Sequence, residues 1–134
     1  MSIEIQQTER EGIAVVYLNG RLTVGPEVAT FRERMQKLFD SGGRSVILNL
    51  KDVDYIDSTG LGALVMSYTS QQKVGGKVKL LNLSRRGIEL LVMTKLTTIF
   101  EVFDDEQNAI NSFFPDRELK RFDILSFVQH HRDE

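Results

Sequence analysis

Short runs of apolar residues open the chain in a pattern typical of β-strands. Apolar and polar residues alternate over roughly residues 3–8, which predicts a first strand. Glu11-Gly12 then turns the chain into residues 13–18, a run rich in β-branched side chains. Two neighbouring strands are therefore expected at the start of the chain.

Two further signals divide the region that follows. Asn19-Gly20 is a strong hairpin signal, because both residue types tolerate a positive φ. Residues 21–24 are therefore expected to return as a third short strand. Gly25-Pro26 ends that strand, and proline suits the first turn of a following helix.

The pattern then changes to helical spacing. Apolar residues three and four positions apart predict one buried helix face, formed by Val28, Phe31, Met35, Leu38 and Phe39. Residues 45–50 are almost continuously apolar, which is typical of a strand covered on both faces.

The rest of the chain alternates between helices and strands. The expected elements are a helix from Ser58 to Gly75-Gly76, a strand at 77–83, a helix capped by Ser84, an edge strand at 99–103 and a helix opened by Asp104-Asp105. The order β-β-β-α-β-α-β-α-β-α predicts an α/β fold, in which helices pack on a mixed sheet with right-handed crossovers.

Size and charge narrow the class of protein. A chain of 134 residues with 41% hydrophobic and 27% charged residues is expected to form one soluble domain. Its net charge of −2 gives no general attraction to nucleic acid or to an anionic membrane. The absence of cysteine excludes disulfides and thiol catalysis. With no signal peptide and no apolar run near the roughly 20 residues of a membrane helix, a cytoplasmic protein is expected.

Residues 57–62 (DSTGLG) form the corner between the apolar run and the next helix. Ser58 is the expected N-cap, because a serine there accepts a hydrogen bond from an otherwise unsatisfied backbone N–H. Gly60 and Gly62 each cost roughly 1 kcal/mol relative to alanine within a helix. Two glycines in a first helical turn indicate that a phosphate, a ligand or another protein needs room there.

Motifs for catalysis and metal binding do not fit this corner. A serine hydrolase elbow needs glycine two residues before Ser58, where Ile56 stands. Neither a phosphate-binding P-loop nor a dinucleotide fingerprint is complete. The carboxylates within residues 52–57 lack further oxygen ligands at calcium-loop spacing and indicate a solvated loop. His130 and His131 are adjacent, so on a helix their side chains would diverge and could not easily share a metal. We therefore predict no catalytic residue, cofactor or metal site.

Ser58 offers a different kind of chemistry. A phosphate at a helix N-terminus gains from the helix dipole and from free backbone N–H groups, so it should not unfold the domain. It would add about two negative charges beside Asp57. A partner docked over Gly60 and Gly62 would then meet both bulk and charge. A serine that only caps the helix explains the same residues, so local chemistry leaves both interpretations open.

The corner also carries a family resemblance. Together with residues 46–50 before it, the corner resembles the STAS domain family and, within it, the anti-sigma-factor antagonists. The resemblance spans roughly residues 3–113 and includes residues 19–22 and 75–77. It implies a STAS-like mixed β-sheet with helices packed mainly on one face, and no catalysis by the domain.

The resemblance further implies a switch between protein partners. Antagonists of this family bind a serine kinase that is also an anti-sigma factor, phosphorylation breaks the complex, and a serine phosphatase restores it. By motif position the phosphorylated residue is Ser58, and Thr59 is the less favoured acceptor. The expected partner-binding residues are Asp57, Ser58, Thr59, Gly60, Leu61, Gly62, Arg21 and Thr23. Thr23 stands where many antagonists carry an acidic residue, which indicates a different kinase-facing surface.

Pro115 marks an expected boundary. Residues 1–114 are predicted to form the STAS domain, and residues 115–134 a helical C-terminal extension. The apolar residues of this extension indicate either a helix docked on its own domain or an element that binds a partner or a second copy. A monomer is expected, with a dimer through the extension left open.

Two other functions remain as alternatives. The first is a STAS scaffold that is never phosphorylated and holds partners in a larger signalling assembly without regard to Ser58. The second is a sensor of a small molecule or nucleotide, which the missing phosphate loop disfavours.

Overall fold

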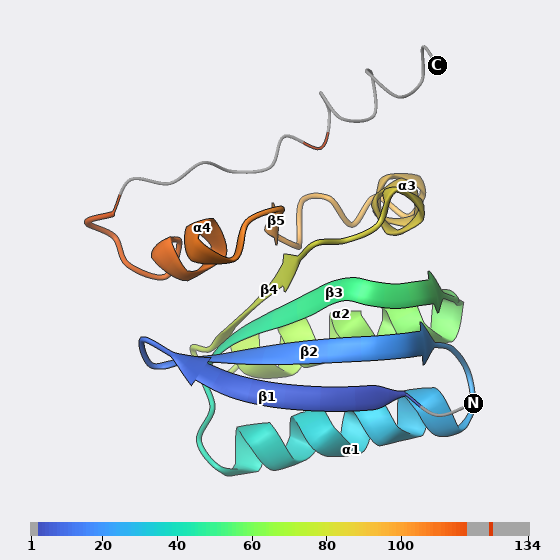
Figure 1. The fold of residues 1–134 in the computed structure, drawn as a ribbon, viewed down its shortest axis with the longest axis horizontal. Coiled ribbons are helices and arrows are strands. Elements are labelled where there is room, and N and C mark those ends of the chain that lie inside the picture. The colour runs from blue at the N-terminus through green and yellow to red at the C-terminus, as the bar shows by residue number, and fades with distance from the viewer. Residues whose placement is uncertain (1–2, 118–123, 125–134) are drawn as a thin grey trace.

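The computed structural model describes residues 3–117 and residue 124, and it has the α/β fold that the sequence predicts. Within these residues, a five-stranded sheet in the order β1-β2-β3-β4-β5 is packed by helices (Figure 1). Along the chain the elements are β1 (Glu4–Arg10), β2 (Ile13–Leu22), α1 (Pro26–Asp40), β3 (Ser45–Ile56), α2 (Ser58–Gln72), β4 (Lys77–Leu81), α3 (Arg85–Met93), β5 (Val102–Phe103) and α4 (Glu106–Asn111).

The sheet opens with a hairpin that is not at the predicted position. β1 and β2 pair antiparallel and turn at Glu11 and Gly12, whose φ angles are 54° and 82°. The prediction of a hairpin at Asn19-Gly20, followed by a third strand, is wrong. Both residues lie inside β2, where Gly20 has a φ of 124° and the pairing with β3 shifts register. Pairing with β3 thus accommodates the two residues as an irregularity and overrides the local turn signal.

β3 is longer than its apolar run suggests. Residues 46–50 are buried on both faces as predicted, and the strand then continues alongside β2 to Ile56. Asp52 and Asp54 therefore lie at exposed positions of a strand, with Val53 buried between them, and the predicted loop is wrong. The predicted edge strand at 99–103 is reduced to the two residues of β5.

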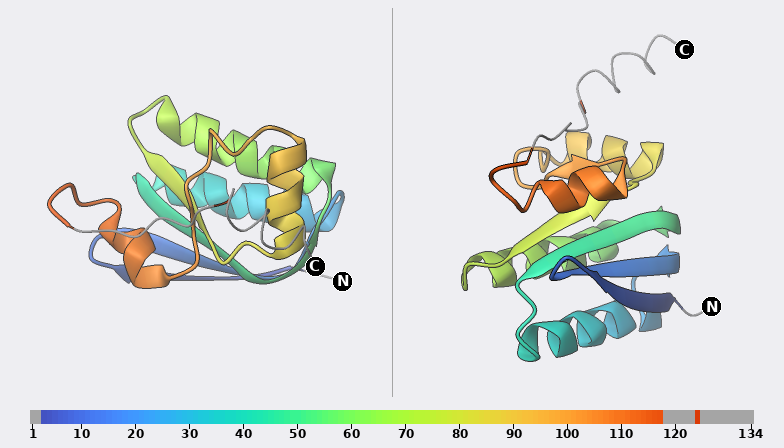
Figure 2. Two further views of the ribbon diagram at one scale, coloured as in Figure 1. Left: turned by 90° about the horizontal axis from the view of Figure 1, so that it is seen from above. Right: turned by 60° about the vertical axis from the view of Figure 1, so that its left-hand side comes forward.

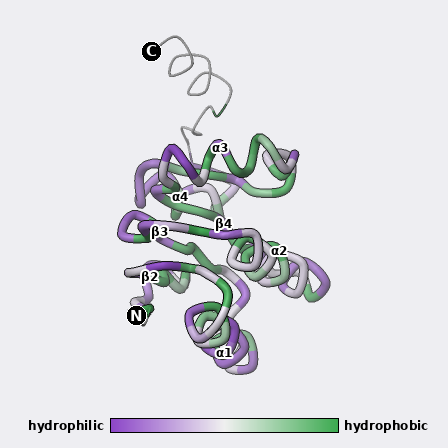
Figure 3. The backbone as a smooth tube through the Cα atoms, turned by 90° about the vertical axis from the view of Figure 1, so that its right-hand side faces the viewer, coloured by the Kyte–Doolittle hydropathy of each residue, from purple (hydrophilic) through white to green (hydrophobic). Residues whose placement is uncertain are grey.

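Two layers of helices enclose the sheet. α1 and α2 cover one face and α4 packs on the opposite face (Figures 1 and 2). Figure 3 shows both hydrophobic and hydrophilic residues along α1, and the predicted apolar stripe of this helix faces the main core. The smaller core under α4 is formed by Ile13, Val15, Ile47, Leu81, Phe103, Ala109 and Ile110. The two longest helices thus share one face of the sheet.

The later helix ends follow the predicted signals. Ser84 caps α3, and its Oγ accepts a hydrogen bond from the backbone N–H of Gly87 at 3.1 Å. Asp105 caps α4 in the same way, accepting from Asn108 N at 2.9 Å. Gly75, with a φ of 81°, follows the end of α2.

Little of the predicted extension falls within the described residues. Arg117 forms an ion pair with Glu11 at 2.7 Å, and Ile124 packs partly buried against the main core. The predictions of a tail helix and a tail-mediated dimer concern residues outside the described part, as do His130 and His131. In the described part of the chain, no helix is both long and apolar enough to cross a membrane.

Candidate functional site

The corner between β3 and α2 is held by Asp57. Its backbone is extended (φ −95°, ψ −177°), and its Oδ1 accepts a hydrogen bond from Gly60 N at 2.8 Å. Asp57 is therefore the N-cap of α2, and the prediction of Ser58 as the cap is wrong. The reason is a second contact, because Asp57 Oδ2 accepts from Val24 N at 2.8 Å and so ties the end of the β2 region to the helix.

These contacts set the charge state of the corner. The N–H groups of Val24 and Gly60 stabilise the charged carboxylate and hold the pKa of Asp57 below its ordinary value of 3.8. Asp57 is therefore an anion at neutral pH. Its charge lies at the positive end of the α2 dipole, where an anion is favourable.

The two glycines of the corner have different surroundings. A Cβ on Gly60 would lie 2.0 Å from the carbonyl oxygen of Leu22, so this glycine allows α2 to pack on the backbone of β2. A Cβ on Gly62 would meet nothing within 4 Å. The room that the sequence indicated at Gly60 is thus filled by the protein itself, and only Gly62 leaves open surface.

The remaining predicted partner-binding residues divide by exposure. Ser58 and Arg21 are exposed, and Thr59 and Thr23 are half-buried. Leu61 packs into the main core, as does Leu22 next to Arg21. The structure brings the end of β2 and the start of α2 together. At the start of α2, the side chain of Ser58 is exposed to solvent.

Sequence reasoning missed two exposed apolar residues on or next to these elements. Val24, whose N–H bonds Asp57, is 66% exposed, and Met66 on α2 is 58% exposed. The available signals were a valine directly before a Gly-Pro turn and a methionine four residues after Gly62, off the buried stripe of α2. Val24 lies at the corner, whereas Met66 lies further along α2 and lines a groove with Met35 and Phe39 of α1.

A third missed feature joins the ends of two strands to α3. The guanidinium carbons of Arg21 and Arg86 lie 5.9 and 5.8 Å from the centre of the Tyr55 ring. Tyr55 is the penultimate residue of β3, just before the corner, and is 42% exposed. Among the described residues, no group of three His, Asp or Glu side chains gathers as a metal site would require.

The profile of the STAS domain matches residues 4–109. The chain belongs to the STAS domain family. Among curated proteins, the anti-sigma-B factor antagonist of Bacillus subtilis is 35% identical over 110 residues, which cover 82% of this chain and 99% of the relative.

Two solved structures of SpoIIAA have a similar fold. One is described as an anti-sigma factor antagonist and the other as a Bacillus cell fate determinant. The first, the unphosphorylated form, has a TM-score of 0.62 at 22% identity and covers 84% of this chain and 99% of SpoIIAA. The second, the phosphorylated form, has a TM-score of 0.65 at 21% identity and covers 82% of this chain and 99% of SpoIIAA.

Proposed function

We propose that this STAS protein is an anti-sigma-factor antagonist that works by partner switching. The unmodified corner binds a serine kinase that is also an anti-sigma factor, and phosphorylation of Ser58 releases it. A serine phosphatase then restores the binding form. The regulator acts in the cytoplasm without catalysis of its own, and the domain formed by residues 1–114 is the binding unit.

The observation that carries this proposal is that Asp57 caps α2 and the Ser58 hydroxyl is left exposed. Because Asp57 caps α2, the cap does not depend on the Ser58 hydroxyl. Ser58 is the first residue of α2, is exposed, and makes no side-chain hydrogen bond to any described residue. Phosphorylation of Ser58 therefore breaks no contact of the described fold and places a dianion at a helix N-terminus that favours it.

The surroundings of Ser58 supply a reason for release. The open surface at Gly62 and the exposed side chain of Val24, whose backbone N–H bonds Asp57, offer a partly apolar contact area beside the corner. A partner packed on this area would have to desolvate a phosphate that carries about two negative charges. The switch is then local, and the domain does not need to change shape.

The relatives give independent support for the class of partner. The Bacillus subtilis relative is named as an antagonist of an anti-sigma-B factor, and SpoIIAA is known in unphosphorylated and phosphorylated forms. These relatives support an anti-sigma factor as the target of this chain.

Binding measurements with Ser58 variants test the proposal. The unmodified protein is used to capture its kinase from its own cells, and the affinity of the purified kinase is then measured by calorimetry. Ser58→Glu should weaken binding about tenfold or more, because it adds a charge within the contact area. Ser58→Ala should bind like the wild type but resist release by kinase and ATP.

Thr59→Ala is the matched control, since it removes the neighbouring hydroxyl and should remain sensitive to ATP. Equal affinity of wild type and Ser58→Glu would contradict the switch. A stable complex that is indifferent to every change at Ser58 would instead support the scaffold function.

A further inference from the structure

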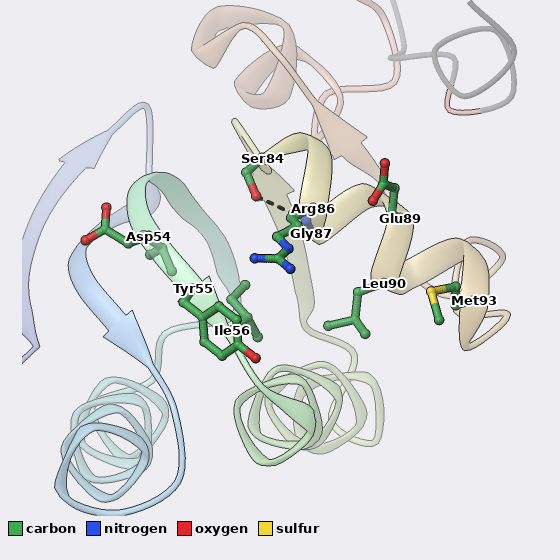
Figure 4. Close-up of a pocket in the computed structure, with 10 residues that line it drawn as sticks. Asp54, Tyr55, Ile56, Ser84, Arg86, Gly87, Glu89, Leu90 and Met93 are labelled. Atoms are coloured by element: carbon green, nitrogen blue, oxygen red, sulfur yellow. Dashed lines mark hydrogen bonds between the residues drawn. The ribbon is translucent and has the colours of Figure 1, made fainter. Parts of the chain in front are cut away.

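A cavity of about 260 Å³ lies between the end of β3 and α3. The β3 residues that line it end at Ile56, two positions before Ser58. Tyr55 and Ile56 form its wall on β3, and Arg86 and Leu90 form its wall on α3 (Figure 4). Met93, 78% exposed at the end of α3, forms its rim. The cavity therefore extends the surface around Ser58 toward α3.

An Arg–Tyr–Arg cluster, formed by Arg21, Tyr55 and Arg86, lies at this cavity. Tyr55 and Arg86 line the cavity, and Arg21 lies beside Tyr55 on the neighbouring strand β2. Both guanidinium carbons lie within 6 Å of the Tyr55 ring centre, a distance at which cation–π attraction holds them in place. In the described part of the chain, neither Arg21 nor Arg86 has a carboxylate at ion-pair distance. By contrast, the neighbouring Arg85 pairs with Glu89 at 3.4 Å.

The acidic side chains of the cavity do not neutralise the cluster. Figure 4 shows the guanidinium of Arg86 directed toward the Tyr55 ring, whereas the carboxylates of Asp54 and Glu89 point away from it. Two guanidiniums with free hydrogen-bond donors thus face the same exposed ring. Each guanidinium can bind a carboxylate through two parallel hydrogen bonds, so the cluster favours acidic side chains.

We propose that the Arg–Tyr–Arg cluster is a second contact for the anti-sigma partner and takes an acidic side chain from it. This inference rests on the proposed function and adds a specificity determinant to it. The partner reads the phosphorylation state of the chain at Ser58 and its identity at the cluster. A partner lacking a carboxylate at this position leaves two desolvated guanidiniums unpaired and is rejected.

The composition of the surface favours a protein segment over a free small anion. Arginine, tyrosine and methionine are the residue types enriched at the centres of protein interfaces, and all three are exposed here. The cavity also adjoins the corner through the unbroken stretch of residues 55–58. One partner surface can therefore cover Ser58 and the cluster together.

Charge reversal tests the inference on the full chain with the captured and purified kinase as the probe. Arg86→Glu and Arg21→Glu should each weaken binding of the unphosphorylated protein about tenfold or more, because they replace attraction by repulsion. Lys73→Glu, an equal change of charge at the exposed end of α2, should leave affinity within about twofold. Unfolding temperatures of all variants are measured to exclude an effect of misfolding.

Two further readouts separate recognition from a structural role. Arg86→Gln should flatten the dependence of affinity on salt, since it removes one screened attraction. Tyr55→Phe keeps the ring that orients both guanidiniums and should bind like the wild type, whereas Tyr55→Ala should weaken binding.

The outcomes distinguish this inference from the proposed function. If Ser58→Glu abolishes binding while Arg86→Glu and Arg21→Glu bind like Lys73→Glu, the switch stands and the second contact is refuted. If the salt dependence is unchanged in Arg86→Gln, the cluster only supports the fold and the inference fails. If no kinase binds the unmodified chain, the proposed function fails and this inference falls with it.

Discussion

At the scale of single residues, the corner depends on a carboxylate with two backbone contacts. Asp57 joins Gly60 on its own helix to Val24 on a segment 33 residues away in the chain. This second contact explains why Asp57 and not Ser58 caps α2, although both residue types are good N-caps. The sequence located the corner, but it could not rank the two neighbours, because the deciding donor is remote.

Removal of the Asp57 carboxylate should destabilise the fold. Asp57→Ala loses both contacts and should lower the free energy of unfolding by about 1 to 2 kcal/mol. Asp57→Asn keeps a capping oxygen for Gly60 N and should lose less. Urea unfolding at pH 7 measures both, with Asp54→Asn as a control, because the exposed Asp54 carboxylate bonds no described residue.

The lowered pKa of Asp57 also predicts how the stability of the fold depends on pH. The folded pKa of Asp57 lies below its unfolded value, so its contribution to stability is present at neutral pH and is lost as the pH falls through the folded pKa. The stability difference between wild type and Asp57→Asn should therefore shrink below about pH 4. A difference that stays constant from pH 7 to pH 3 would show that the contacts do not favour the charged form.

The two glycines of α2 should respond in opposite directions to alanine. Gly60→Ala places a methyl group against the backbone of Leu22 and should destabilise the fold by about 1 to 3 kcal/mol. Gly62→Ala enters open space and should stabilise the helix by up to about 1 kcal/mol. Chemical denaturation of both variants checks this pair, and equal effects of the two changes would contradict the assigned surroundings.

At the scale of elements, long-range pairing decided what the sequence left open. The buried strand β3, the α1 stripe and the caps of α3 and α4 were predictable, because each is written in a local pattern. The structure at Asn19-Gly20 was not predictable, because pairing of β2 with the remote strand β3 continues through these residues and prevents a hairpin there. For the same reason the Arg–Tyr–Arg cluster was invisible, since its three residues come from β2, β3 and α3.

A buried cation links β4 to the elements after it. Lys79 lies on β4 with its side chain only 4% exposed, and its Nζ lies 2.8 Å from Glu101 Oε2. Nζ also donates to the carbonyl and hydroxyl oxygens of Ser112, at 3.2 and 2.9 Å, and lies 4.4 Å from the centre of the Phe113 ring. These contacts fasten the segment after α4 to the sheet.

Loss of the Glu101 charge should loosen this attachment. Glu101→Gln removes a negative charge that lies 2.8 Å from the buried Lys79 cation and should destabilise the fold by about 1 to 3 kcal/mol. Glu89→Gln breaks the exposed pair with Arg85 and should change stability by less than about 1 kcal/mol. Thermal unfolding compares them, and an equal loss in both variants would show that burial of Lys79 adds nothing to the ion pair.

At the scale of the whole molecule, the parallel strands gather the candidate site at one end. β2 and β3 end side by side next to the start of α2, as Figure 1 shows, and the register pairs Leu22 with Ile56 at this end. Arg21, Tyr55 and Ser58 therefore come together although they belong to three elements. The layers of helices and sheet were predictable from the alternation of strands and helices in the sequence. The proximity of Arg21, Tyr55 and Ser58 was not, because it depends on how far β3 extends beyond its apolar run.

Ser58 lies between two residues that are held by contacts of the fold. The corner is fixed by Asp57 on one side and by the close packing of Gly60 on the other. A phosphate added there changes charge and shape at the surface and leaves the described contacts in place. Regulation is therefore expected to reside in one covalent modification at one residue.

The most direct test is intact-mass and phosphopeptide analysis of the protein isolated from its own cells. The account predicts a form heavier by about 80 Da, with the phosphate on Ser58 and its loss after phosphatase treatment. Thr59 serves as the internal control, because it lies in the same peptide and should stay unmodified. A phosphate that maps to another residue, or none under any growth condition, would contradict the account and favour a scaffold that does not use Ser58 as a switch.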